Sequence, residues 1–168
     1  MHRRAVLKSL SVGLVAATGG CIANGRVAMD KSQSVTVEPE DGWWSELPDV
    51  GGNGALSFTV RADQQFDVYY FQGESPLNSY KNYLYKDDDS KMPDGHDDIS
   101  QAAVPKSGSD EYEVKVPNDG GRESIDTEGT HFFVIDHSNY GKGVRVEEFG
   151  EPLDAFVDLK IIEQTSVI

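Results

Sequence analysis

The segment His131-Phe132-Phe133-Val134-Ile135-Asp136 is apolar at every position between its first and last residue. A strand that is apolar on both faces is covered on both faces, so this segment predicts the central strand of a sheet. Apolar and polar residues alternate at 56–62, 112–116 and 155–161, as in strands that are covered on one face only. The aromatic and β-branched run at 66–71 is also typical of a strand. Together these segments predict an all-β protein.

Turn-forming residues separate the predicted strands, at 51–54, 118–121 and 141–143. Weaker strand candidates are 83–85, 99–104 and 144–146. No stretch beyond residue 33 keeps a helical period for three turns. The pattern therefore predicts one domain over 34–168, an antiparallel β-sandwich or jelly roll of about seven to nine strands.

The N-terminus has the layout of a signal peptide. Arg3, Arg4 and Lys8 precede a short apolar run at 9–17, and small residues lead to Cys21. The apolar run is well short of the ~20 residues that a transmembrane helix needs. We therefore expect residues 1–20 to form a signal peptide, and the small, polar residues 21–33 to form a flexible tether.

Two motifs in this region resemble known export signals. Arg3 and Arg4, followed by Leu7-Lys8, resemble the twin-arginine signal, which implies the twin-arginine translocase as a partner during export. Thr18-Gly19-Gly20-Cys21 resembles a lipobox, which implies a lipid on Cys21, the only cysteine in the chain. Together with the acidity, these motifs resemble those of lipoproteins from halophilic archaea. The resemblance implies a protein anchored by its lipid at the outer face of the cytoplasmic membrane.

Composition supports a globular and strongly acidic body. The chain has 168 residues, 38% of them apolar, and a net charge of −14 from 29 acids and 15 bases. The first 20 residues hold three bases and no acid, so the remainder carries 29 acids and 12 bases, a net charge of −17. Such a body is a poor candidate for nucleic-acid binding, because phosphate binding depends on neutralisation by Lys and Arg. The charge favours a salt-adapted protein, since molar salt screens its self-repulsion.

One polar cluster raises the question of calcium. Its acidic residues include Asp87, Asp89, Asp94, Asp97 and Asp98. Oxygen-rich loops can bind Ca²⁺, although this spacing does not match an EF-hand loop. The alternative is a solvated loop of an acidic surface, and the sequence favours it.

No catalytic motif is present. His96, His131 and His137 lack zinc-site spacing, and the two histidines that bound the central strand are expected to point out of its core. The segment 136–138 contains Asp, His and Ser. However, neighbours on a strand point to opposite faces, so they do not form a triad. A binding role is favoured, and the alternative is an extracytoplasmic hydrolase whose site is assembled from distant residues.

Trp43 and Trp44 are the aromatic residues that a binding surface would use. Exposed rings stack on sugars or form a patch for another protein. Alternatively, one ring packs against the sandwich and the other covers its edge, which is the ordinary role of aromatic residues in strands.

A weaker resemblance concerns the fold. The segment 129–138, Gly-Thr-His-Phe-Phe-Val-Ile-Asp-His-Ser, resembles a strand of small extracellular jelly rolls such as pre-peptidase C-terminal domains. Those domains are accessory or binding modules. The sequence thus predicts a surface-anchored binding or accessory module whose ligand or protein partner it does not identify.

Overall fold

A computed structural model of the chain describes residues 25–85, 97–115, 123–141 and 149–164. Within these ranges the chain forms ten strands and one helix. In order they are β1 (Gly25–Val37), β2 (Asp41–Leu47), β3 (Gly54–Ala62), β4 (Asp67–Gln72), α1 (Glu74–Tyr85), β5 (Asp97–Ala102), β6 (Val104–Pro105), β7 (Tyr112–Lys115), β8 (Glu123–Ile125), β9 (His131–His137) and β10 (Leu153–Gln164).

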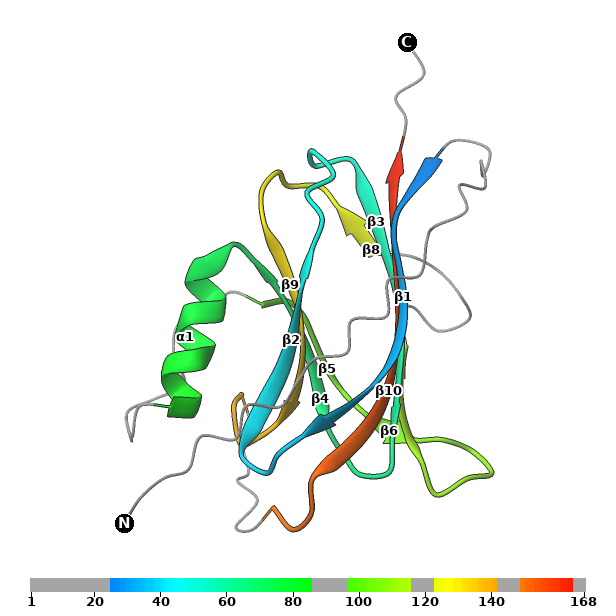
Figure 1. The fold of residues 1–168 in the computed structure, drawn as a ribbon, viewed down its shortest axis with the longest axis vertical. Coiled ribbons are helices and arrows are strands. Elements are labelled where there is room, and N and C mark those ends of the chain that lie inside the picture. Colours follow the sequence, from blue (N-terminus) through cyan, green and yellow to red (C-terminus); the bar gives the residue numbers. More distant parts are fainter. Residues whose placement is uncertain (1–24, 86–96, 116–122, 142–148, 165–168) are drawn as a thin grey trace.

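The strands build two antiparallel sheets that pack face to face (Figure 1). The six-stranded sheet has the order β1-β10-β3-β7-β6, with β8 pairing to another part of β3. The four-stranded sheet has the order β2-β9-β4-β5, and α1 covers its outer face. The predicted β-sandwich is therefore confirmed.

The strand β9 lies in the interior of the four-stranded sheet, as its apolar sequence predicts. Phe133 and Ile135 face the other sheet and join the main core, whereas Phe132 and Val134 face α1. All seven residues of β9 are buried. The two terminal histidines are buried as well, so the expectation that they point out of the core was wrong. The sheet around β9 and the loops at its ends cover both of them.

Residues 25–33, expected to belong to a flexible tether, instead lie in β1. This strand pairs with β10 from Gly25↔Gln164 to Val37↔Leu153, with one irregularity between Val27 and Met29. Polar side chains hide the strand pattern because β1 is an edge strand. Lys31, for example, occupies a half-buried position, with its Nζ 5.5 Å from the centre of the Trp43 ring. The folded body thus begins earlier than its sequence pattern indicates.

The weak strand prediction at 83–85 was also wrong, because these residues end the helix α1. Pro76 lies in the first turn, where a missing N–H costs nothing. Leu77, Tyr80 and Leu84 follow at helical spacing and pack on the sheet. The helix has only three turns and is rich in Tyr, Ser and Asn, which explains why its period was difficult to recognise.

Several other predictions can be placed. Gly51 and Gly52 both have positive φ, as expected for the predicted turn there. The strand predicted at 99–104 corresponds to β5 and β6, whereas 118–121 and 144–146 lie outside the described residues.

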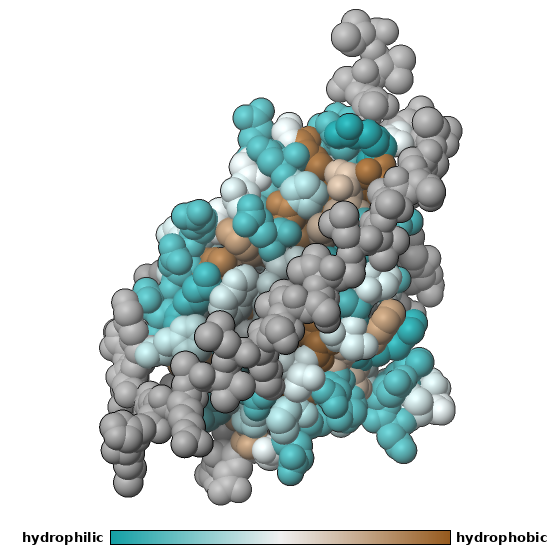
Figure 2. Space-filling view, in the orientation of Figure 1, coloured by the Kyte–Doolittle hydropathy of each residue, from teal (hydrophilic) through white to brown (hydrophobic). Residues whose placement is uncertain are grey.

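No helix in the described part of the chain is long and apolar enough to cross a membrane. Hydrophilic residues dominate the described surface in Figure 2, with apolar residues in small separate areas.

Candidate functional site

The outward-facing side chains of the six-stranded sheet are mostly polar. Strand β10 runs through this face between β1 and β3, and its outward positions are Asp154, Phe156, Asp158 and Lys160. Register places Ser34 of β1 on one side of Phe156 and Arg61 of β3 on the other. An aromatic ring therefore stands in the middle of a polar row.

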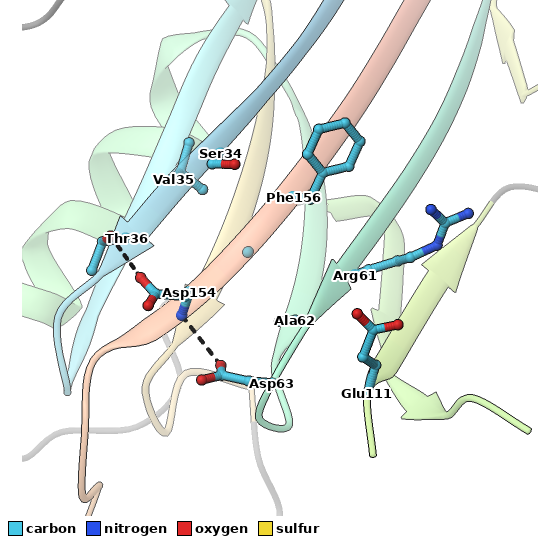
Figure 3. A pocket seen from close by; sticks show the side chains of 10 residues that line it. Ser34, Val35, Thr36, Arg61, Ala62, Asp63, Glu111, Asp154 and Phe156 are labelled. Atoms are coloured by element: carbon cyan, nitrogen blue, oxygen red, sulfur yellow. Dashed lines mark hydrogen bonds between the residues drawn. The ribbon is translucent and has the colours of Figure 1, made fainter. Parts of the chain in front are cut away.

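A shallow groove of about 660 Å³ opens on this face near the C-terminal end of β1. Its lining comes from β1, β3, β10 and the chain next to β7. The lining residues are Ser34, Val35, Thr36, Arg61, Ala62, Asp63, Glu111, Asp154, Ala155 and Phe156. Figure 3 shows Phe156 toward one end of the groove and Asp63 toward the other.

Phe156 is the one large apolar side chain that is exposed in this groove. Its exposed fraction is 43%, and within the described ranges only Tyr85 and Val104 are comparable. A single exposed apolar residue is common on protein surfaces. This one differs in that it lines a groove together with charged and hydroxyl groups, so that one ligand could contact the ring and the polar groups together.

Two carboxylates of the groove are held in place by hydrogen bonds. The Thr36 hydroxyl donates to Asp154 Oδ1 at 2.8 Å, and the Asp154 N–H donates to Asp63 Oδ1 at 3.3 Å (Figure 3). Both side chains are exposed. These hydrogen bonds orient the carboxylates and leave acceptor capacity for a ligand.

The other charged groups of the groove are paired. Arg61 Nε lies 2.8 Å from Glu113 Oε2, and Lys106 Nζ lies 2.9 Å from Glu111 Oε2. The groove therefore offers an aromatic ring, hydroxyl groups and carboxylates along one shared surface. This is the chemistry of reversible binding through ring contacts and hydrogen bonds.

The predicted aromatic pair does not form one surface. Trp43 packs toward the core between the sheets, whereas Trp44 packs toward α1, and both are half-buried. Lys81 Nζ lies 4.5 Å from the centre of the Trp44 ring. Trp44 also lines a second, mostly polar pocket of about 490 Å³ between α1 and β2.

The polar residues after the central strand build a buried network. Asp136 Oδ1 accepts hydrogen bonds from Tyr80 Oη at 2.7 Å and from Ser138 Oγ at 2.6 Å. Burial raises the pKa of Tyr80 well above its ordinary value, and the Asp136 carboxylate raises it further. Asp136 itself is fully buried, so this network ties α1 to the sheet rather than facing a ligand.

The two described histidines do not share a site. They stand at opposite ends of β9, about 20 Å apart at ~3.3 Å per residue. His131 Nδ1 lies 2.8 Å from Tyr70 Oη, and its Nε2 lies 3.1 Å from the Thr127 carbonyl oxygen. His137 Nε2 lies 3.3 Å from the Glu151 carbonyl oxygen. As a neighbour of Asp136 in β9, His137 points to the opposite face of the sheet. The 136–138 segment thus does not assemble a triad.

Other predicted site residues lie outside the description. Arg3, Arg4 and Cys21 precede the first described residue, and the structure does not describe Asp87, Asp89, Asp94 or His96. Asp97 and Asp98 begin β5, with side chains that are not described. Within the described residues, no group of three His, Cys, Asp or Glu side chains could hold a metal ion.

Sequence reasoning did not select the groove residues, although one signal was available. In the last strand the outward positions are Asp154, Asp158, Lys160 and, between them, the aromatic Phe156. A large apolar residue on the polar side of an alternating strand marks a surface feature. Its neighbours Ser34 and Arg61 could be found only once the strand order was known.

Comparison of the chain with models of known protein families gives no match, and comparison with curated proteins gives none either.

Proposed function

We propose that this chain is an exported, lipid-anchored surface protein whose folded body is a binding module. The proposed export and lipid anchoring rest on Arg3, Arg4 and Cys21, whose pattern resembles a twin-arginine signal followed by a lipobox. The resemblance of residues 129–138 to small extracellular jelly rolls agrees with an accessory or binding role. The acidity of the body agrees with a salt-rich environment.

One observation carries the binding role, the groove that combines Phe156 with oriented carboxylates. The groove lies on an open sheet face and is shallow, which favours reversible contact with a ligand that remains partly in solvent. Such contact does not require an enclosed cavity with buried groups that converge on the ligand.

Export and lipid anchoring are tested by substitutions at these positions in the native host. Cys21→Ser should move the protein from the detergent phase to the aqueous phase in detergent partitioning, because no acyl chain can be attached. Lys in place of both Arg3 and Arg4 should abolish surface display, while Lys8→Arg serves as the control. A Cys21→Ser protein that still partitions with detergent would disprove the anchor, and normal display of the double-Lys variant would disprove the route.

The binding role is tested by NMR on the whole chain carrying Cys21→Ser. Backbone amide shifts are followed during titration with a neutral sugar, an organic cation and an organic anion. At least one class should give saturable shifts at the groove residues, and Phe156→Ala should abolish them. Val104→Ala is the matched control, since Val104 is 61% exposed and does not line the groove. Absence of groove shifts with every class would overturn the proposal.

A further inference from the structure

We infer that the ligand of the groove is an organic cation, a primary ammonium or guanidinium group carried on a short apolar stem. This inference rests on the proposed binding role and names the class of ligand that the groove accepts. It follows from three features of the lining, namely its charge, its aromatic ring and the geometry that joins them.

The first feature is an excess of negative charge. The lining includes the carboxylates of Asp63, Glu111 and Asp154 and a single cationic group, that of Arg61. Arg61 is already paired with Glu113, and Glu111 is paired with Lys106. Asp63 and Asp154 form no ion pair within the described part of the chain. An incoming cation would therefore meet two carboxylates whose charge is not compensated locally.

The second feature is the ring of Phe156. An aromatic face attracts a cation within about 6 Å of its centre, and the same face buries methylene groups. Lysine-like and arginine-like groups place a charge at the end of an apolar stem. Asp154 lies two residues from Phe156 on the same face of β10, about 7 Å along the strand, so a stem of a few methylene groups that contacts the ring would bring its charged head to this carboxylate.

The third feature is the hydrogen bonding of the carboxylates. The donor to Asp154 Oδ1 is the Thr36 hydroxyl, and the donor to Asp63 Oδ1 is the backbone N–H of Asp154. Both carboxylates are therefore positioned by neutral groups, which leaves their charge available. An ammonium or guanidinium group that donates to them forms charge-assisted hydrogen bonds, the stronger kind.

Other ligand classes fit this lining less well. An anion would face three carboxylates with one guanidinium that is already engaged. A neutral sugar could stack on the ring and accept from Arg61, but it would leave the charge of Asp63 and Asp154 unbalanced. The net charge of −17 beyond residue 20 also attracts cations to the whole surface.

The inference is tested by the same NMR titrations, with n-butylammonium and n-butylguanidinium as probes at about 0.2 M and about 2 M KCl. Ammonium chloride measures the contribution of the apolar stem, because it carries the charge alone. Methyl β-glucoside represents a neutral sugar, and butyrate represents an anion with a similar stem. Both butyl cations should shift the groove amides with saturation. Ammonium should bind roughly tenfold more weakly because it has no methylenes to bury. Butyrate should give no saturable shifts, and high salt should weaken the butyl cations.

Isosteric substitutions of Asp by Asn remove the charge of a carboxylate while they keep the shape of the groove. Asp154→Asn and Asp63→Asn should each weaken n-butylammonium roughly five- to tenfold. Asp158→Asn is the control, because Asp158 lies on the same face of β10 and accepts from Ser32 Oγ at 3.0 Å, as Asp154 does from Thr36. It lies outside the groove, so its change should alter the dissociation constant less than twofold.

The outcomes distinguish the inference from the proposed function. In one outcome, the glucoside shifts the groove amides in a way that Phe156→Ala abolishes, while the butyl cations give no shifts. That result would overturn the inference of an organic cation and would leave the proposed binding role in place. Equal effects of Asp154→Asn and Asp158→Asn would also overturn the cation, because the attraction would then be a property of the whole surface. Absence of groove shifts with all probes would overturn both.

Discussion

At the scale of single residues, burial of Asp136 depends on groups that come from distant parts of the chain. Its carboxylate is fully buried and accepts from Tyr80, which lies 56 residues away, and from Ser138. Gly42 is the residue opposite Asp136 on β2, and a Cβ there would overlap the Tyr80 hydroxyl. The absence of a side chain at Gly42 thus allows Tyr80 to reach Asp136.

Tyr80→Phe should lower the free energy of unfolding by about 2 kcal/mol, because a buried carboxylate loses a donor. Chemical denaturation at neutral pH measures this change. Tyr85→Phe is the matched control, since Tyr85 also donates to a carboxylate, Asp41, but is 59% exposed. It should cost less than about 0.5 kcal/mol. Equal losses for the two variants would contradict a special role for the buried hydrogen bond.

Tyr80 should also make the protein sensitive to alkali. Its pKa is raised in the folded state by burial and by Asp136, so folding favours the protonated phenol. The stabilisation is complete below the ordinary pKa of ~10 and is lost as the pH rises above it, where the unfolded chain releases the proton first. The free energy of unfolding, measured from pH 8 to 11, should fall less steeply in Tyr80→Phe. Identical slopes would exclude Tyr80 as the source.

Gly42→Ala should destabilise the protein by about 1–3 kcal/mol, the usual cost of overpacking. The added methyl would displace the Tyr80 ring from Asp136. Gly150→Ala provides the control because a Cβ at that position has open space, and it should change stability by less than about 0.5 kcal/mol. Thermal melts of the two variants measure this difference in stability. Similar melting temperatures would contradict a close contact between position 42 and the Tyr80 ring.

At the scale of elements, strands with a strong hydrophobic pattern of their own, either alternating or continuous, could be predicted, whereas strands with mostly polar residues could not. The segments that became β3, β4, β9 and β10 carry their own hydrophobic pattern. Strand β1 is stabilised by pairing with β10 along its length, a property of the partner rather than of its own residues. The helix α1 is stabilised by tertiary contacts of a few side chains, which a short sequence window does not reveal.

Leu77→Ala should cost about 3 kcal/mol, because Leu77 is 3% exposed and packs between α1 and the sheet. Asn78→Ala, at the adjacent exposed position, should cost less than about 0.5 kcal/mol. Urea denaturation followed by far-ultraviolet circular dichroism measures both. A small loss for Leu77→Ala would mean that α1 is only loosely attached to the sandwich.

At the scale of the whole molecule, the architecture could be predicted and the candidate site could not. Alternating segments and frequent turns are enough to specify two packed sheets. The groove requires β1, β10 and β3 to be neighbours, although they are far apart in the chain. Of its residues, only Phe156 leaves a mark in the sequence, whereas Asp63 and Asp154 resemble any other surface acids of a chain with 29 of them.

The acidity of the whole molecule predicts salt dependence. The melting temperature should rise between about 0.2 M and about 2 M KCl, because salt screens the repulsion among carboxylates. A variant with less negative charge tests this explanation. In it, three exposed acids that lie outside the groove, Asp110, Glu123 and Glu128, are replaced by their amides. This variant should melt higher than the parent in dilute salt and respond less to KCl. Equal melting curves at both salt concentrations would refute the role of charge.

The early start of β1 determines how high above a membrane each part of the body would stand. Four residue steps separate Cys21 from Gly25, so a lipid on Cys21 would hold the start of β1 within about 14 Å of the bilayer surface. Ser34 lies nine residues further along the strand, about 30 Å away. So short a connection would keep the N-terminal end of β1 close to the membrane surface. If β1 points away from the membrane, the groove lies on the part of the body that is farther from the bilayer, and soluble molecules reach it without passing the lipid headgroups.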